Sequence, residues 1–413
     1  MTAFLQNLRL EELATEGPID AGAEEELFRD IGRQAAADAL KRRWERADSG
    51  TVGQCGTCGR VLQDVGIRTK LFRTLCGPVQ VQRRVGYCRD CHETTAGLDE
   101  RLGADETGIT PGLRRVICRV ALELAYDPTK SLLRDTLGMT PCSSREIERI
   151  ADLHGTQMDK PESVAAAMPR QRAKKIYCLA IDGTMIPGLP DPHEHRLEWH
   201  EVKLATVFDP RDIEPPFYVA GIEDSETFGQ RLWKEFQNRA IDDRWLLRIL
   251  GDGAPWIWNL AEVHFPGVPQ LLDFYHAAEH LHQTAAALWP EGTADAWWHR
   301  RLDQLKDGEL GNFFAALKLI AKRHQTNDPA ISPERLLGYF EDNRQRLGYS
   351  EALRQNLPIG SGAVESAGRH IVQQRLKQSG MRWSILGAQA VLNLRTRHRS
   401  GQFEQYWENL AAG

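Results

Sequence analysis

Residues 176–183 read Ile-Tyr-Cys-Leu-Ala-Ile-Asp-Gly, an unbroken apolar run that ends in Asp182 and a glycine. Six apolar residues match the length of a buried strand, and an Asp-Gly pair after them is typical of a strand end. Residues 245–253, Trp-Leu-Leu-Arg-Ile-Leu-Gly-Asp-Gly, repeat this pattern and place Asp252 after a second strand. Further strand-like runs occupy 202–208, 217–222 and 270–273. Helical patterns separate these runs, so the sequence predicts a mixed α/β core.

The composition of the whole chain limits the class of protein. It has 413 residues, 41% of them apolar, and a formal net charge of −5. That length predicts about two to four domains. The acidic balance excludes a small, uniformly basic nucleic-acid module but leaves local basic surfaces open. With no run of about 18 apolar residues and no signal-peptide pattern, we expect a cytoplasmic protein without a membrane partner.

Four cysteines form two CxxC pairs, Cys55 with Cys58 and Cys88 with Cys91. Residues 51–95 also alternate polar and apolar side chains, which predicts a β-hairpin with its turn at Gly77-Pro78. Two pairs on tight turns can bring four thiolates onto one tetrahedral zinc ion. Ordinary thiols are the alternative, and a redox role needs only one pair. Two pairs in a cytosolic-type chain favour a zinc ribbon with one structural Zn²⁺.

Helices are predicted on both sides of the cysteine region. Residues 10–48 are rich in helix formers. Residues 128–137 and 143–153 flank the turn Gly-Met-Thr-Pro at 138–141, which is the pattern of a helix-turn-helix. Ser143 or Ser144 can cap the second helix, which presents Arg145 and Arg149 as candidate DNA contacts. Plain packing of two short helices is the alternative.

Asp182 and Asp252 can share divalent cations if a third carboxylate lies nearby. Glu365, in Gly-Ser-Gly-Ala-Val-Glu at 360–365, is the natural third. Two metal ions about 3.5–4 Å apart can activate a nucleophile and stabilise the leaving oxygen in phosphoryl transfer. Mg²⁺ prefers carboxylate ligands of this kind. Ordinary turn chemistry explains an Asp-Gly pair equally well, so spacing alone leaves this site weakly supported.

Five segments resemble the DDE transposases of bacterial insertion sequences, above all the Kra type, which is related to Mutator-like and ISL3-type enzymes. These segments are Ile181–Thr184, Leu250–Trp258, Leu272–His276, Ile359–Glu365 and Gln374–Ser384. The resemblance covers about residues 50–400. It implies an RNase H-like catalytic core in which Asp182, Asp252 and Glu365 are the DDE triad. It also implies supporting roles for Asp273 and His276.

The activity implied by this resemblance is recognition of insertion-sequence ends, followed by Mg²⁺-dependent DNA cleavage and strand transfer. The implied cofactors are two Mg²⁺ (or Mn²⁺) ions. The implied partners are double-stranded DNA, as terminal repeats and as target, and further copies of the chain in a homodimer or higher oligomer. The implied location is the bacterial cytoplasm, at the nucleoid.

Two other functions remain open. The first is a domesticated, non-catalytic DNA-binding protein derived from a transposase, which would have no need of three carboxylates. The second is a zinc peptidase, because His276-Ala-Ala-Glu279-His280 matches the HxxEH pattern. That pattern is short and arises by chance.

Residues 366–403 contain no Asp or Glu, while Lys and Arg recur through them. Such a basic tract in an acidic protein suits phosphate contacts, and a tryptophan within it can stack on a splayed base. The alternative is a solvated helix face with the tryptophan in the core. The predicted DNA contacts of this tract are Arg369, Arg375, Lys377, Arg382 and Trp383.

The predicted order of parts follows from these patterns. It is an N-terminal helical segment (1–50), a zinc ribbon (51–95), a helix-turn-helix region (96–160), an RNase H-like core (170–276), an all-helical insertion (277–356) and C-terminal core helices with the catalytic Glu and the basic tract (357–413).

Overall fold

The computed structural model describes residues 20–48, 50–138, 141–160, 176–190, 196–241, 245–324 and 331–412. The chain divides into two compact units, residues 1–151 with 407–413, and residues 152–406. Each unit combines helices with a β-sheet, which confirms the mixed α/β prediction. Within the described ranges, no helix is long and apolar enough to cross a membrane.

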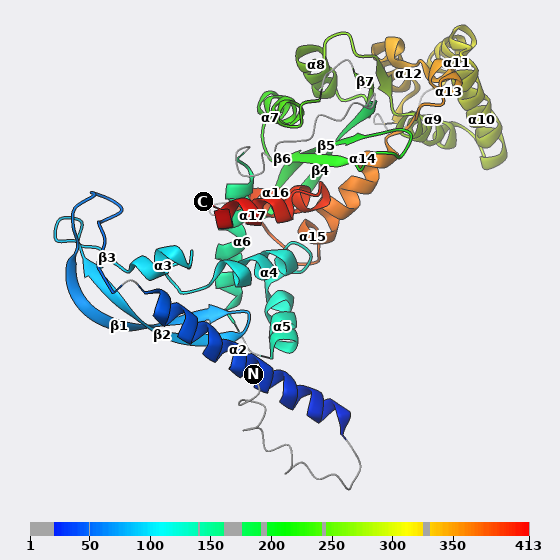
Figure 1. The fold of residues 1–413 in the computed structure, drawn as a ribbon. Helices are drawn as coiled ribbons and strands as arrows, with labels where there is room; N and C mark the ends of the chain where they lie inside the picture. The colour runs from blue at the N-terminus through cyan, green and yellow to red at the C-terminus, as the bar shows by residue number, and fades with distance from the viewer. Residues whose placement is uncertain are drawn as a thin grey trace. The chain divides into compact units, whose positions relative to one another are not determined.

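The first helix of the described chain, α2 (Ala21–Ala47), lies alongside a long β-hairpin (Figure 1). Asp20 caps it by accepting a hydrogen bond from the Ala23 amide at 3.1 Å. The predicted start near residue 10 falls outside the described residues. The C-terminal half of α2 packs on the hairpin, where the rings of Trp44 and Phe72 meet edge to face at 5.7 Å.

The hairpin contains β1 (Gln63–Thr74) and β2 (Gly77–Tyr87), and the short β3 (Thr94–Thr95) completes an antiparallel sheet of order β1-β2-β3. Its turn falls at Leu75 and Cys76, so the prediction of a turn at Gly77-Pro78 was wrong. Gly77 has φ +112° and already pairs with Thr74. Gly77 does adopt a backbone conformation that favours glycine, but it is the first strand residue after the turn.

Four helices follow in the same region of the chain: α3 (Gly97–Arg101), α4 (Pro111–Ala121), α5 (Tyr126–Leu137) and α6 (Ser144–Met158). Gly138 ends α5 in the left-handed conformation. Ser143 caps α6, because its hydroxyl accepts from the Glu146 amide while the Glu146 carboxylate accepts from the Ser143 amide. This reciprocal capping box confirms one of the two predicted caps. Met139 and Thr140, in the predicted turn, lie outside the described residues.

The second unit is built on a five-stranded mixed sheet of order β6-β5-β4-β7-β8. Its strands are β4 (Tyr177–Pro190), β5 (Leu197–Phe208), β6 (Phe217–Gly221), β7 (Leu246–Gly251) and β8 (Gln270–Leu272). β4, β5 and β6 pair antiparallel, whereas β4, β7 and β8 run parallel. Residues 178–181 of β4 are fully buried, as expected for a central strand covered on both faces.

Helices cover both faces of this sheet (Figure 1). On one side are α7 (Ser225–Asn238) and α8 (Pro255–His264); on the other are α14 (Gly362–Ala367) and α16 (Ile385–Arg399). A π-helix (Gly368–Gln373) and the short α15 (Gln374–Leu376) follow α14, and α17 (Phe403–Ala412) ends the described chain. The Ser384 hydroxyl caps α16 by accepting a hydrogen bond from the Gly387 amide at 3.1 Å.

The described residues between β8 and α14 form five α-helices and a short 3-10 helix (Arg344–Arg346), and none of them forms a strand. The α-helices are α9 (Phe274–Leu288), α10 (Glu291–Asp307), α11 (Leu310–Arg323), α12 (Pro333–Asp342) and α13 (Tyr349–Arg354). This helical stretch separates Glu365 in sequence from the strands that carry the two aspartates.

Candidate active site and metal centre

The two predicted aspartates occupy matching positions on neighbouring strands. Parallel pairing of β4 with β7 ends at Ala180 and Leu250, and Asp182 and Asp252 each lie two residues further along. The prediction that Asp182 follows its strand was wrong, because β4 continues and pairs Asp182 with Leu204 of β5. Beyond Ala180, β4 stays paired with β5 on one edge, and only its other edge, which faces β7, is no longer paired. Both carboxylates therefore lie at the carboxyl end of the parallel pair, where clefts form in α/β sheets.

The loop that carries Asp252 is held from two sides. The Asp252 carboxylate accepts a hydrogen bond from the Ala254 amide at 2.9 Å, just before α8 begins. The Tyr339 hydroxyl, from α12, donates to the Asp252 carbonyl at 2.8 Å. Gly253 has φ +105°, and a Cβ there would lie 2.8 Å from the Tyr339 ring. Glycine is therefore needed both for the turn and for the close approach of the tyrosine.

Glu365 completes the predicted set from the opposite end of the sequence. It is exposed on α14 and lines a cavity of about 210 Å³ together with Asp182, Leu204 and Arg369. Burial raises the pKa of Asp182 to about 6, and the negative charges of Asp252 and Glu365 add to that rise. The three carboxylates thus lie in one electrostatic environment.

The donor chemistry of this trio fits a hard divalent cation, since carboxylate oxygens are the ligands that Mg²⁺ prefers. Their oxygen atoms do not all lie within 4.8 Å of one another. In the part of the chain that the structure describes, the four cysteines alone meet that spacing. Coordination of one ion by all three carboxylates would therefore require them to move closer together.

Asp273 is buried, and its hydrogen bonds connect β7, α9 and the residue that precedes α14. Its amide donates to the Gly251 carbonyl of β7 at 2.7 Å. One carboxylate oxygen accepts from the amides of Tyr275 and His276 and caps α9, at 2.6 and 2.9 Å. The other accepts from the Ser361 amide at 2.6 Å, next to the first residue of α14. Asp273 therefore positions the helix that carries Glu365.

We expect Asp273→Ala to destabilise the protein by about 2–3 kcal/mol, because the cap and the bond to the buried Ser361 amide are lost together. The matched control is Asp224→Ala, which removes the carboxylate that caps α7 by accepting from the Thr227 amide at 2.8 Å. That change should cost about 1 kcal/mol. Urea denaturation of both variants measures the difference. An equal loss in the two variants would show that the bond to Ser361 adds nothing.

His276 and His280 lie on one face of α9, with ring centroids 4.8 Å apart, and His280 contacts the Tyr339 ring at 4.5 Å. Glu279 is exposed, and its carboxylate accepts a hydrogen bond from the side-chain amide of Gln283 at 3.0 Å. These HxxEH residues form no group with metal-ligand spacing among the residues described. The peptidase alternative therefore gains no support.

The raised pKa of Asp182 gives the metal-free protein a testable pH dependence. The unfolded chain loses this proton near its ordinary value of 3.8 and the folded chain near 6, so stability falls as the pH rises across that interval. We expect Asp182→Asn to stabilise the protein by about 1–3 kcal/mol near pH 7.5 and hardly at all near pH 4. Denaturation in EDTA at both values measures this. The same stabilisation at both values would contradict it.

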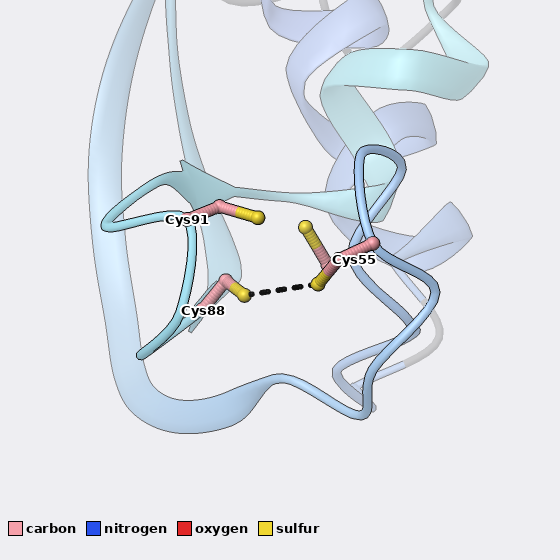
Figure 2. Close-up of side chains that lie close together, drawn as sticks. Cys55, Cys88 and Cys91 are labelled. Carbon is pink, nitrogen blue, oxygen red and sulfur yellow. Dashed lines mark hydrogen bonds between the residues drawn. The ribbon is translucent and has the colours of Figure 1, made fainter.

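The four predicted zinc ligands converge in the structure. Cys55, Cys58, Cys88 and Cys91 place their sulfur atoms within 4.8 Å of one another, and Figure 2 shows the labelled side chains pointing toward one another. The sulfurs of Cys58 and Cys88 are 3.5 Å apart. Four converging thiols suit a tetrahedral zinc ion far better than a redox pair.

The two CxxC turns are built alike and are joined to each other. The Cys55 amide donates to the Arg60 carbonyl at 2.7 Å, and the Cys88 amide donates to the Glu93 carbonyl at 2.9 Å. An ion pair of 2.6 Å between Arg60 and Asp90 links the turns. Backbone amides within the first turn lower the pKa of the Cys55 thiol to about 7, whereas the pKa values of Cys58 and Cys91 are raised, with the neighbouring thiols among the causes.

Three residues of the predicted basic tract are exposed: Arg369, Lys377 and Arg382. The Lys377 ammonium donates to the Thr184 hydroxyl at 2.7 Å, and it interacts electrostatically with the Asp182 carboxylate. Arg369 lines the cavity that Asp182 and Glu365 share. These cations therefore border the candidate site.

The predictions for Arg375 and Trp383 were wrong. Arg375 is 1% exposed and packs its guanidinium over the Trp383 ring, 5.0 Å from the centroid. Trp383 is also buried; its indole donates to the Leu376 carbonyl, and its backbone bonds to Pro187 and Leu189 of β4. Both side chains hold this segment on the sheet and are not presented to DNA.

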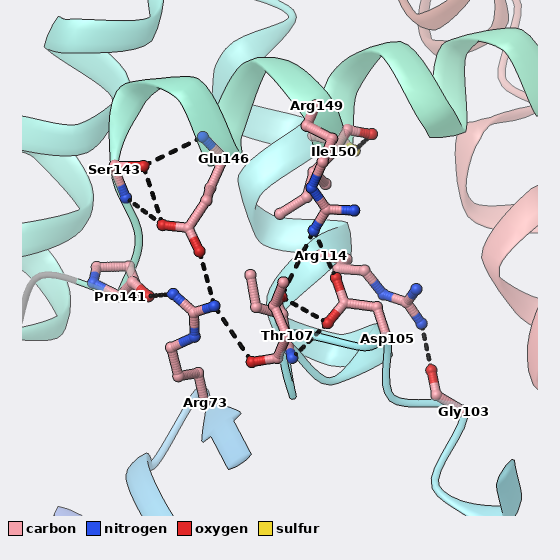
Figure 3. A network of polar contacts seen from close by, with 12 residues as sticks. Arg73, Gly103, Asp105, Thr107, Arg114, Pro141, Ser143, Glu146, Arg149 and Ile150 are labelled. Carbon is pink, nitrogen blue, oxygen red and sulfur yellow. Dashed lines mark hydrogen bonds and ion pairs between the residues drawn. The ribbon is translucent and has the colours of Figure 1, made fainter. Parts of the chain in front are cut away.

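The two predicted DNA contacts on α6, Arg145 and Arg149, have different surroundings. Figure 3 shows those of Arg149. Arg149 pairs with Asp105 at 2.9 Å, and Glu146 pairs with Arg73 of β1 at 2.7 Å. Arg145 is exposed on the same helix. The guanidinium of Arg149 therefore already takes part in an ion pair within the protein, whereas that of Arg145 faces solvent.

Two further residues that support the site were not predicted. Tyr339 reaches Asp252 from the helical stretch, and no local pattern marks it. Arg395 is buried and donates to the carbonyls of His370 and Ile371 in the π-helix that follows Glu365. No local pattern marks this structural role, which only the three-dimensional packing reveals.

Comparison with solved structures finds a similarity to the Drosophila P element transposase strand transfer complex, at 11% sequence identity and a TM-score of 0.36. The match covers 74% of this chain and 95% of that chain. No protein-family model and no curated protein matches. A similarity at this level assigns no activity to the chain.

Proposed function

We propose that residues 152–406 form the RNase H-like catalytic core of a DNA transposase of the bacterial insertion-sequence type, with Asp182, Asp252 and Glu365 as its triad. The observation that carries this proposal is the matched position of the two aspartates beyond the last β4–β7 pair, with Glu365 on a helix beside them. The mixed sheet with helices on both faces supports it. So does the resemblance of five sequence segments to Kra-type enzymes.

The residues of the site have separate roles in this proposal. Mg²⁺ or Mn²⁺, when bound, would activate a water or a DNA 3′-hydroxyl and stabilise the leaving oxygen. The three carboxylates would hold the metal, and Asp273 would fix the direction from which Glu365 approaches. Lys377 and Arg369 would bind backbone phosphates at the rim.

The first unit would recognise the ends of the element. Its zinc-centred turns would stabilise the hairpin, and Arg145 would contact the DNA backbone. The competing proposal is a DNA-binding protein that has lost catalysis. The burial of Asp182 beside two other carboxylates argues against that alternative, because clustered like charges weaken a fold that makes no use of them.

The test is a cleavage assay with a plasmid that carries this gene and its natural flanking DNA. We expect strand breaks at the element ends in Mg²⁺, joining of those ends to a second plasmid, and no products in EDTA. Specific binding without breaks under every divalent cation would favour the non-catalytic alternative. Neither binding nor breaks would contradict the proposed function.

The exposed cations of the basic tract make a separate prediction. Lys377→Ala with Arg382→Ala should weaken DNA binding and reduce the dependence of log affinity on log salt by about two, since roughly one counterion is released for each phosphate contact. The control is Lys234→Ala, an exposed lysine on α7. Binding measured across a salt series provides the slope. An unchanged slope would mean that these residues do not contact phosphate.

A further inference from the structure

The β1–β2 hairpin has one covered face and one free face. On the covered face, Phe72, Val79 and Val81 are buried under α2. On the other face, three exposed β1 side chains stand opposite three from β2 in register. These pairs are Ile67 with Arg84, Thr69 with Gln82 and Leu71 with Gln80. We call these six residues the ribbon face.

The local charge favours a polyanionic partner. Residues 51–95 contain seven basic and three acidic residues, a net charge of +4 within a chain whose net charge is −5. Arg84 belongs to the ribbon face itself, whereas Arg68, which pairs with Arg83, is exposed on the opposite face of the hairpin. Helix α6 carries Glu146, Glu148 and Asp152 against two arginines, so its own balance is acidic. The hairpin is therefore the better electrostatic match to DNA.

The dimensions and side chains of the ribbon face fit the major groove. A two-stranded β-ribbon is one of the two elements that this groove admits. Ile67 to Leu71 spans about 14 Å at the rise of an antiparallel strand, which equals roughly four base pairs. Gln80 and Gln82 have no side-chain hydrogen bonds in the described structure. A glutamine amide can pair with adenine, and the apolar neighbours can contact thymine methyl groups.

Addition of a protein strand to this hairpin is disfavoured. The amides of Gln82 and Arg84, on the outer edge of β2, already donate to Glu45 and Asp48 at 3.0 and 2.7 Å. Near the turn, Arg73 on the β1 edge exchanges backbone bonds with Gly108 and Thr110. An added strand would need unpaired backbone N–H and C=O groups along an edge of the hairpin. Insertion into a DNA groove needs instead an exposed face of side chains.

We propose that the ribbon face enters the major groove of double-stranded DNA, where Gln80 and Gln82 read base edges. Arg145 of α6 then contributes backbone contact without base reading. This inference rests on the proposed function, and it names the element that selects the DNA sequence.

The test is selection by the full-length protein from duplexes with a randomised core, followed by affinity measurements on the enriched and scrambled duplexes. For the double variant Gln80→Ala with Gln82→Ala, we expect the ratio of enriched to scrambled affinity to fall roughly tenfold per glutamine, with an unchanged salt slope. Gln237→Ala, on an exposed residue of α7, is the matched control.

Retention of the full ratio by the double variant would overturn the inference. So would a change in its oligomeric state without DNA, measured by sedimentation, because that would make the ribbon face a contact between copies of the chain. A wild-type protein that enriches no sequence but cuts DNA in Mg²⁺ would overturn the inference alone. One that neither binds nor cuts would overturn the proposed function.

Discussion

Glu365→Gln, Asp182→Asn and Asp252→Asn are each expected to lower the rates of DNA cleavage and joining by on the order of a thousandfold. Each change keeps the shape of the side chain and removes a charge that the metal ions require. Loss of several kcal/mol of transition-state stabilisation corresponds to that factor. The measurement is the rate of product formation from labelled element ends in Mg²⁺.

Specific DNA binding by these variants should remain, because the proposal places end recognition in the first unit. The control is Glu291→Gln, an exposed carboxylate on α10 away from the described site. It should cut at the wild-type rate. A Glu365→Gln protein that still cuts would remove Glu365 from the triad and leave the two aspartates to be paired with another carboxylate.

The second large effect is expected from the cysteine cluster. Cys88→Ser should abolish binding of one zinc per chain and unfold residues 51–95, because an apparent binding energy of about 10–16 kcal/mol is then lost to folding. That value is comparable to the whole stability of a typical domain, about 5–15 kcal/mol. Specific DNA binding should be lost with it. Zinc analysis by mass spectrometry and hydrogen exchange over residues 51–95 are the measurements.

Cys76→Ser is the matched control, since Cys76 is a half-buried thiol in the hairpin turn and lies outside the four-cysteine group. It should keep its zinc and its exchange protection. Residues 152–406 should exchange as in the wild type in both variants, because they form a separate compact unit. Purified, reduced wild-type protein without zinc would contradict the assignment.

The existence of the core strands was predictable because each contains a short apolar run. The end of β4 and the start of β5, which begins at Leu197 and not at residue 202, were not. Asp182-Gly183 ends the apolar run, yet the strand continues to Pro190 because β5 supplies hydrogen-bond partners along that edge. Pairing with a distant strand can hold residues that their own side chains would not keep extended.

The candidate site also has residues that the sequence could predict and contacts that it could not. Asp182, Asp252 and Glu365 could be named from motifs, and so could the four cysteines, because short spacings and a family resemblance mark them. The bond from Ser361 to Asp273 joins residues that no pattern connects. Arg375 and Trp383 were misassigned because composition does not distinguish a solvent-facing cation from one stacked in the interior.

The start and the end of the helical stretch between β8 and α14 are hydrogen-bonded neighbours. The Phe274 amide donates to the Ile359 carbonyl at 3.0 Å, and the Asp273 carboxylate holds the Ser361 amide one step further on. A chain excursion that leaves and returns at one point can change in length with little added closure entropy. We therefore expect this stretch to tolerate insertions, deletions or replacement by another helical domain while Glu365 keeps its place, provided that the contact of Tyr339 with Asp252 is preserved.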